Sequence, residues 1–310
     1  MHTGLLIAMG IYIAVILTVA IVLKSRIRTE EDFLIGGRRF GLWLTTFSLF
    51  ATWFGAGTLI AATDEVFAEG LKITALEPYG AGMCLVFSSL LIAKPLWNMG
   101  IMTYSDFYRI KCGKKVEVMS VFINIPVYVG WIAVQIITLA NILHIFFPIP
   151  LWILMVMIAL LSLVLTMSGG LWSVSITDSV QLIVIICGLV YLFLKVFGLF
   201  PSSWLELISS VEPAKRVFLP IDNTEELLSW LSLFSIAALG NMTGQDMVQR
   251  MLSAKSADVA RTGCLLAGFM YIVFGTIPVL LGLTAGVTLG EVKGSVVPQL
   301  IESYLDPVTA

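Results

Sequence analysis

Apolar runs of membrane-spanning length alternate with short polar segments along almost the whole chain. A helix needs about 20 predominantly apolar residues to cross the hydrocarbon core of a bilayer, and eight segments meet that requirement. The pattern therefore predicts an all-α bundle of membrane-spanning helices. The predicted spans cover residues 4–23, 42–68, 76–93, 118–147, 151–168, 174–197, 227–245 and 262–285.

The composition agrees with this interpretation. Hydrophobic residues make up 58% of the 310 residues, charged residues make up 12%, and the mean hydropathy is +0.98, which excludes an ordinary water-soluble domain. We expect a polytopic membrane protein in contact with a lipid bilayer. The net charge of −2 and the lack of a long basic block give no reason to expect a nucleic-acid partner. The four cysteines follow neither a disulfide framework nor a metal-binding spacing.

Lys and Arg are distributed unevenly between the segments that join the predicted spans. With the N-terminus outside, 13 of them fall on the inner side and 5 on the outer side. Cytoplasmic loops are enriched in these residues, so the sequence predicts a plasma (inner) membrane protein with an outside N-terminus. The first span is expected to be retained, because no small-residue cleavage site ends it. The inner set is Lys24, Arg26, Arg28, Arg38, Arg39, Lys94, Arg109, Lys111, Lys114, Lys115, Arg250, Lys255 and Arg261; the outer set is Lys72, Lys195, Lys215, Arg216 and Lys293.

The segment ATWFGAG, residues 51–57, lies inside the second predicted span. Gly55 and Gly57 loosen the helix at a depth where lipid cannot satisfy free backbone groups. Irregular backbone at membrane depth is tolerated where it lines a cavity or is buried in protein. The segment therefore predicts a site for an ion or a solute. The alternative is that its small residues allow close packing of helices.

Three longer motifs follow one another along the chain. They are EEDFLIGGRRFGLW at residues 30–43, TMSGGLWSVSITDSVQ at 166–181 and GQDMVQRMLSAKSADVAR at 244–261. Together they resemble the sodium/solute symporter family over essentially the whole chain. Within that family, GGLWSVSITDSVQL at 169–182, ATW at 51–53 and AKP at 93–95 are similar to the choline-transporter-like branch.

The resemblance implies a LeuT-type core, in which two inverted repeats of five helices follow one extra N-terminal helix. On that mapping residues 1–310 are a single transmembrane transporter domain: 1–41 hold the extra helix and an inner loop, 42–197 the first repeat, and 198–310 an outer loop and the opening of the second repeat. The family has three further core helices after the segment PQLIESYLDP, residues 298–307. We expect this chain to lack those helices. A fragment or a truncated gene is the preferred explanation, and the alternative is that a separate polypeptide supplies them.

The resemblance also implies candidate sodium ligands. The backbone carbonyls of Ala51 and Phe54 match two sodium-binding positions of the family, and Asp178 matches a position near its sodium path. Sodium prefers oxygen ligands, and a helix break frees carbonyls that would otherwise bond within the helix. The alternative for Asp178 is that it caps the helix after the turn at Gly169 and Gly170.

Aromatic residues carry the implied solute site. Trp53 and Trp131 match two positions of a cage that holds a quaternary ammonium by cation–π attraction, although both could instead pack against neighbouring helices. Two other cage positions fall on Ala81 and Gly244, which are not aromatic. We therefore expect a bulkier or differently charged organic solute in place of choline. The remaining candidates for solute contact are Gly55, Gly57 and Gln245.

The predicted function is sodium-coupled symport of a small organic solute, with Na+ as the coupling ion and no cofactor. Arg250 is interpreted as an inner gate or a charge partner for Asp246, with an orientation role as the alternative. No HExxH, GxSxG or glycine-rich phosphate loop indicates a membrane-embedded enzyme. The alternative function is a membrane sensor or interaction scaffold, in which a transporter-like bundle detects a ligand without moving it.

Overall fold

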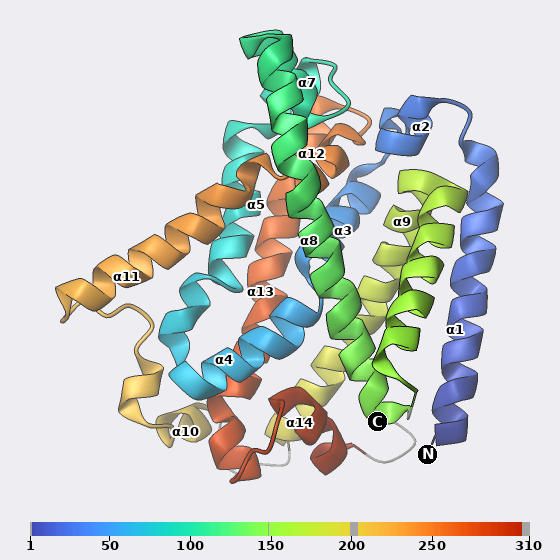
Figure 1. The fold of residues 1–310 in the computed structure, drawn as a ribbon. Helices are drawn as coiled ribbons and strands as arrows, with labels where there is room; N and C mark the ends of the chain where they lie inside the picture. Colours follow the sequence, from blue (N-terminus) through green and yellow to red (C-terminus); the bar gives the residue numbers. More distant parts are fainter. Residues whose placement is uncertain (1, 148, 199–203, 306–310) are drawn as a thin grey trace.

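The computed structural model describes residues 2–147, 149–198 and 204–305, which form a bundle of helices (Figure 1). Among these residues the backbone pairing outside helices is a single isolated bridge between Phe40 and Ala254. The α-helices are α1 (His2–Leu23), α2 (Glu30–Ile35), α3 (Leu42–Trp53), α4 (Ala62–Glu69), α5 (Tyr79–Leu91), α6 (Ala93–Asn98), α7 (Tyr104–Cys112), α8 (Lys114–Phe146), α9 (Leu151–Gly198), α10 (Trp204–Ser209), α11 (Thr224–Ser235), α12 (Gln245–Leu252), α13 (Ala257–Leu289) and α14 (Val296–Tyr304). Short 3-10 turns are η1 (Lys24–Arg26), η2 (Gly36–Arg38), η4 (Leu71–Ala75), η5 (Pro213–Arg216) and η7 (Asn241–Thr243), and wider π turns are η3 (Gly57–Ala61) and η6 (Ile236–Gly240).

Within the described residues, three continuous helices are long and apolar enough to cross a membrane: Lys114–His144 of α8, the whole of α9, and the whole of α13. Two more spans result if each bent pair is counted once, namely α3 with η3 and α4, and α11 to η7 with α12. Each of the eight predicted segments contains helix. However, α9 alone holds two of them and α5 has only 13 residues, so the number of eight spans stays a prediction.

The long helix α9 is folded back on itself at Gly170. Gly170 has φ 49° and ψ −148°, a backbone conformation that only glycine adopts readily. A Cβ at this position would lie 2.7 Å from the carbonyl oxygen of Phe33 in α2. Figure 1 shows that the chain turns at the upper end of the bundle and that the second arm runs back toward the lower end, and α1 packs against α9. The GG pair of the second motif is therefore a sharp turn between two long helices.

The core is centred on α13, which packs against α3, α4 and α5. Gly268 of α13 faces the backbone of Gly82 in α5, and a Cβ at Gly268 would lie 2.8 Å from the Gly82 carbonyl oxygen. Small residues at this crossing let the two helices approach closely, as is common in membrane proteins. In contrast, the most apolar stretch of α8 has no buried residues. α8 therefore presents a long apolar surface suited to lipid.

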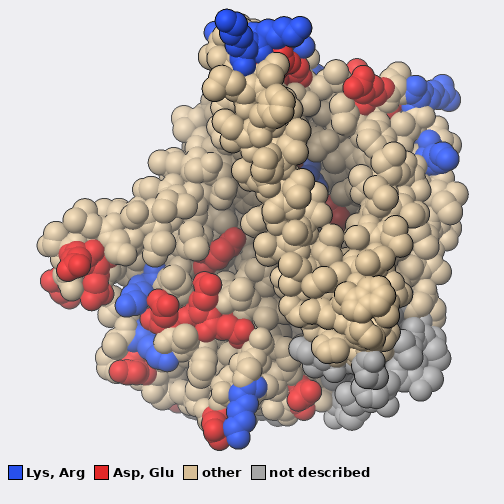
Figure 2. All heavy atoms as spheres, in the orientation of Figure 1, with Lys and Arg blue, Asp and Glu red and all other residues tan. Residues whose placement is uncertain are grey.

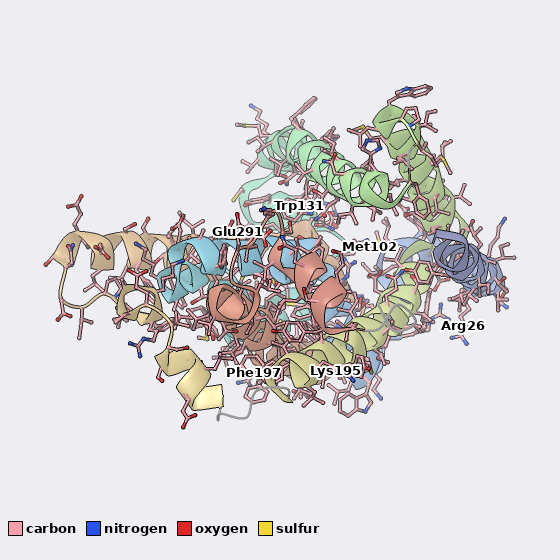
Figure 3. The ribbon with its side chains drawn as sticks, turned by 90° about the horizontal axis from the view of Figure 1, so that it is seen from below. Arg26, Met102, Trp131, Lys195, Phe197 and Glu291 are labelled. Atoms are coloured by element: carbon pink, nitrogen blue, oxygen red, sulfur yellow. The ribbon has the colours of Figure 1, made fainter. Side chains whose placement is uncertain are left out.

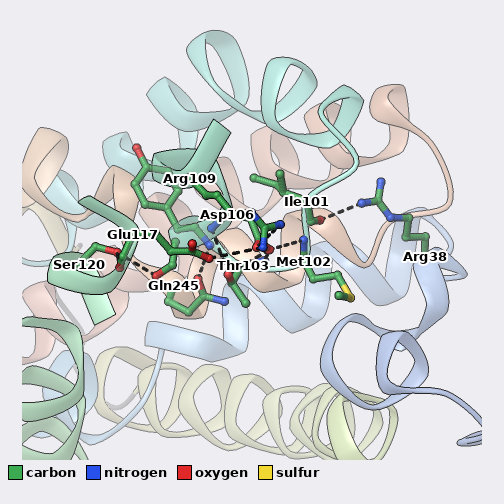
Figure 4. Close-up of polar contacts among 11 residues, drawn as sticks. Arg38, Ile101, Met102, Thr103, Asp106, Arg109, Glu117, Ser120 and Gln245 are labelled. Atoms are coloured by element: carbon green, nitrogen blue, oxygen red, sulfur yellow. Dashed lines mark hydrogen bonds and ion pairs between the residues drawn. The ribbon is translucent and has the colours of Figure 1, made fainter. Parts of the chain in front are cut away.

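The first motif contains α2 and the residues that connect it to neighbouring segments. Asp32 and Thr29 form a reciprocal cap at the start of α2, and Arg39 pairs with Asp32. Burial raises the pKa of Asp32, but hydrogen bonds from Arg28 and Thr29 and the charge of Arg39 outweigh it, so its pKa lies below the ordinary value. Arg38 donates to the carbonyl oxygen of Ile101 at 2.8 Å (Figure 4).

Charged side chains gather at the two ends of the bundle. Figure 2 shows Lys and Arg clustered at the upper end, where α1 gives way to α2 and α7 gives way to α8, whereas acidic side chains with a few basic ones lie at the lower left. The surface between them is mostly tan, which marks residues without a formal charge. This arrangement is typical of a bundle that crosses a bilayer.

Candidate functional site

α3 ends at Trp53, inside the segment that the sequence singles out. Phe54 leaves helical geometry with φ −78° and ψ 81°. The Gly55 N–H donates to the Trp53 carbonyl at 2.9 Å, whereas in a continuous helix it would bond the Ala51 carbonyl. η3 follows, and the two parts of the span are bent by 59°. The helix is broken where the sequence predicts, and the Ala51 carbonyl loses its usual helical donor.

Gly55 and Gly57 are not points of close helix packing. Apart from the adjoining backbone, no described atom lies within 4 Å of the position that a Cβ would take at either residue, so the close-packing alternative is wrong for both. Gly55 and its neighbour Ala56 line a groove of about 430 Å³, whose other walls come from η3, α9 and α14. The break therefore adjoins open space.

A second break separates η7 from α12, where the chain bends by 51°. Gln245 and Asp246 begin α12 and contact side chains of α3 and α8 and the backbone at the start of α7. The Asp246 carboxylate accepts a hydrogen bond from Trp53 Nε1 at 2.7 Å and one from the Tyr128 hydroxyl at 3.4 Å. The Gln245 N–H donates to the same Tyr128 hydroxyl at 2.6 Å. Two of the predicted solute contacts, Trp53 and Gln245, are thus joined through Asp246 and Tyr128.

The Gln245 side chain has a structural task as well. Its Oε1 accepts the Tyr104 N–H at 2.7 Å, at the junction where α7 begins (Figure 4). The same junction is held by Asp106, which caps α7 by accepting the Thr103 N–H at 2.9 Å and pairs with Arg109 at 3.1 Å. Gln245 therefore connects the second helix break to the loop before α7.

Trp131 lies on α8 (Figure 3) and is 57% exposed, so more than half of the residue is free of contact with the described helices. It stands three residues after Tyr128, and residues at that spacing share one face of a helix. Because Tyr128 contacts Asp246, this is the face of α8 that turns toward α12. Figure 2 shows a hollow between α8 and α9 with both basic and acidic atoms inside it. Trp131 and Tyr128 therefore share the side of α8 that is nearest to Asp246.

Asp178 lies in the second arm of α9, two turns beyond Gly170, and does not cap that arm. Its Oδ2 is 3.5 Å from Arg250 Nη2 of α12, and both side chains are mostly buried. Arg250 reaches Asp246 only through the backbone, where its Nη1 donates to the Asp246 carbonyl at 3.0 Å. The expectation that Arg250 is the charge partner of Asp246 is therefore wrong, because its guanidinium is paired with Asp178 instead.

A contact between α3 and α9 relates Asp178 to the first helix break. The Ser48 hydroxyl donates to the Ser175 hydroxyl at 2.9 Å. Ala51 and Asp178 each follow these serines by three residues, and so each lies one turn beyond the contact on the same face of its helix. The three predicted sodium ligands, which include Phe54, thus belong to two helices that touch.

Sequence reasoning missed a buried polar cluster beside the break. The Tyr271 hydroxyl lies 2.6 Å from the Thr58 hydroxyl, 3.0 Å from Glu77 Oε2 and 3.3 Å from the Trp53 carbonyl oxygen, and its single proton can be donated to either of the last two. Thr58 and Tyr271 are almost fully buried. The sequence did contain an indication, because Glu77 is a carboxylate within the predicted span 76–93 and such residues are costly inside a membrane.

Comparison with known proteins identifies a family of related sequences. A family model described as the Sodium:solute symporter family matches residues 33–302. The chain is 30% identical over 295 residues to High affinity choline transporter 1 of Homo sapiens, an alignment that covers 91% of this chain and 50% of that protein. It is 23% identical over 320 residues to Solute carrier family 5 member 4 of Rattus norvegicus, which covers 93% of this chain and 47% of that protein.

A solved structure has a similar fold. It shows a Na+-coupled sialic acid symporter in a substrate-bound outward-open state, and it matches 91% of this chain and 62% of its own with a TM-score of 0.77 at 18% identity. This likeness confirms the predicted all-α, LeuT-type membrane bundle. The chain spans about half the length of the two relatives compared above.

Proposed function

Because this chain belongs to the sodium:solute symporter family, we propose that it serves sodium-coupled symport of a small organic solute, with Na+ as the coupling ion. The chain is a multi-pass membrane protein, and it spans about half the length of its relatives. The proposal therefore concerns the activity of the whole transporter. We place it in the plasma (inner) membrane with its N-terminus outside.

The helix break at residues 54–56 is the observation that carries the proposal. We assign sodium to the backbone carbonyls of Ala51 and Phe54, with Asp178 on the neighbouring arm of α9. The Ala51 carbonyl is free of its usual helical donor, since the Gly55 N–H is turned to Trp53. Oxygen atoms freed in this way are suitable ligands for a hard cation.

The solute is assigned to the space between α3, α8 and α12. Trp53 at the end of α3 and Gln245 at the start of α12 are connected through Tyr128 and Asp246. Trp131 shares the α8 face of Tyr128. We include Gly55 and Gly57 because no neighbouring segment fills the position of a side chain at either residue. The sodium and solute positions thus meet at Trp53, which ends α3.

This shared position explains how the two ligands would be coupled. Sodium at the break would fix the end of α3, and with it the direction of the Trp53 side chain. A ligand shifts a conformational equilibrium by its difference in affinity for the two states. Sodium would therefore favour the outward-open state in which the solute site is formed, and both ligands would enter the cell as one part of the bundle rocks against the rest.

Sodium dependence is the first test. The purified protein in lipid nanodiscs is titrated with NaCl against KCl at constant ionic strength, and the unfolding temperature and tryptophan fluorescence are followed. We expect a saturable rise in unfolding temperature with NaCl only, because a ligand that binds the folded state stabilises it. Identical curves in NaCl and KCl would contradict the proposal.

A transporter is then distinguished from a sensor. Proteoliposomes are given an inward sodium gradient and a panel of labelled amines and neutral organic solutes, with protein-free liposomes as the control. Accumulation that disappears when the gradient is dissipated supports symport. Sodium-dependent binding without accumulation supports the sensor instead, and conversion of a solute to a new product would indicate an enzyme.

A further inference from the structure

The Asp246 carboxylate is held in place by two neutral donors. Its Oδ2 accepts Trp53 Nε1 at 2.7 Å, and its Oδ1 accepts the Tyr128 hydroxyl at 3.4 Å. None of the ion pairs among the described residues includes Asp246. The basic residue closest to it in α12, Arg250, directs its guanidinium to Asp178 and meets only the Asp246 backbone.

This leaves a carboxylate with spare hydrogen-bonding capacity. An ionised carboxylate has about four lone-pair positions, and Trp53 and Tyr128 occupy one on each oxygen. A half-buried negative charge is costly unless a cation or further donors compensate it. Asp246 is half-buried, so its compensating group would approach where Trp53 of α3, Tyr128 of α8 and the start of α12 meet.

Resting on the proposed function, we infer that Asp246 binds the positively charged N–H group of the solute, and that the solute is a primary or secondary organic ammonium. An ammonium N–H would donate to a free lone pair of the Asp246 carboxylate. Such a charge-assisted hydrogen bond is about twice as strong as a neutral one. Trp53 and Tyr128 are then positioning residues that fix the carboxylate before the solute arrives.

The same site is poorly suited to a quaternary ammonium. A quaternary nitrogen has no N–H and is held by aromatic faces. Ala81 is buried in the core and Gly244 has no side chain, so neither provides a ring. Trp53 has its indole N–H edge committed to Asp246. The site therefore offers a directional acceptor where a quaternary cation would need a closed aromatic cage.

Matched pairs of amines test this inference. Each pair is an amine and its N-trimethyl form: ethanolamine with choline, and glycine with glycine betaine. Binding to the protein in nanodiscs is measured by tryptophan fluorescence and by calorimetry, in NaCl and separately in KCl. We expect at least one amine to bind at least tenfold more tightly than its trimethyl partner, a preference of about 1.4 kcal/mol.

Two variants complete the experiment. Asp246→Asn should remove the preference for the amine, whereas Glu291→Gln, which removes a carboxylate from the loop after α13, should keep it. The wild-type preference tests the inference even if Asp246→Asn does not fold. Equal or tighter binding of the trimethyl forms, no binding by either amine, or an unchanged preference in folded Asp246→Asn would overturn it.

The comparison of salts separates this inference from the proposed function. A ligand that binds only in NaCl but shows no preference for amines leaves sodium coupling intact and removes the role of Asp246. An amine preference that is the same in NaCl and KCl supports Asp246 and contradicts the coupling.

Discussion

At the scale of single residues, the end of α3 is fixed by a small set of buried hydroxyls. Tyr271 is fully buried, and its hydroxyl contacts Thr58, Glu77 and the Trp53 carbonyl. Its ring also packs edge-on against Phe54 with centroids 5.4 Å apart. Tyr271 thus contacts both the Trp53 carbonyl and the Phe54 side chain at the break. Removal of its hydroxyl should therefore destabilise this part of the structure.

We expect Tyr271→Phe to lower the free energy of unfolding by about 1–3 kcal/mol, because the Glu77 carboxylate would lose its shortest hydrogen bond and keep only the Thr58 hydroxyl at 3.5 Å. Denaturant unfolding in mixed micelles measures this change. Tyr191→Phe is the matched control: Tyr191 is 38% exposed, so the same loss of a hydroxyl should change stability by under about 0.5 kcal/mol. Equal effects of the two substitutions would show that the cluster does not support the break.

The pair formed by Asp178 and Arg250 changes how a substitution of Asp178 must be interpreted. Asp178→Asn removes a proposed sodium ligand but also leaves the mostly buried Arg250 guanidinium without its carboxylate, and breaking such a pair destabilises a protein. Loss of sodium response in the single variant could therefore reflect loss of fold.

The double variant Asp178→Asn with Arg250→Gln separates the two effects. We expect Asp178→Asn to raise the half-saturating sodium concentration by about tenfold or more, which equals about 1.4 kcal/mol, and the double variant to recover yield without recovering sodium affinity. The sodium titration of unfolding temperature provides the measurement. Unchanged sodium affinity in folded Asp178→Asn would remove this residue from the sodium site.

At the scale of elements, the turn within α9 depends on Gly170. Its positive φ is unfavourable for any residue with a Cβ, and the added carbon would also collide with the Phe33 backbone. The arm that follows carries Ser175 and Asp178, so the turn determines where these side chains meet α3 and α12.

Gly170→Ala should therefore destabilise the protein by about 1–3 kcal/mol or more from backbone strain alone. Gly188→Ala provides the control in the same element, because it lies in the helical part of the second arm and no described atom is within 4 Å of its added Cβ. That change should be neutral or stabilising by up to about 1 kcal/mol. Thermal unfolding of the two variants side by side measures the difference, and similar unfolding temperatures would contradict the role given to the turn.

At the scale of the whole molecule, local sequence patterns predicted the helix bundle and the first helix break. They did not predict which side chains pair with Asp178 and Asp246. The break follows from Gly55 and Gly57 in an apolar run, a property of neighbouring residues. The contact between Asp178 and Arg250 joins residues 72 positions apart, and that between Trp53 and Asp246 joins residues 193 apart. Such pairs depend on how α3, α9 and α12 pack, which hydropathy does not specify.

The uneven distribution of charge at the two ends of the molecule predicts its orientation. The basic end in Figure 2 contains the junctions between α1 and α2 and between α7 and α8, and the positive-inside rule assigns this end to the cytoplasm. The exposed Cys112 at the end of α7 is a natural reporter there, since Cys84 and Cys264 are buried. Cys187 is exposed and must be replaced by Ser.

In right-side-out vesicles of the Cys187→Ser variant, a membrane-impermeant maleimide should label Cys112 only after permeabilisation, because the reagent cannot cross the bilayer to the cytoplasmic end. The matched reporter adds Cys112→Ser and Glu291→Cys to the same background. Glu291 lies in the loop after α13, on the face seen from below in Figure 3, and should be labelled without permeabilisation. The reverse pattern at both positions would place the N-terminus inside, and the face that receives the solute would then be the opposite end of the bundle.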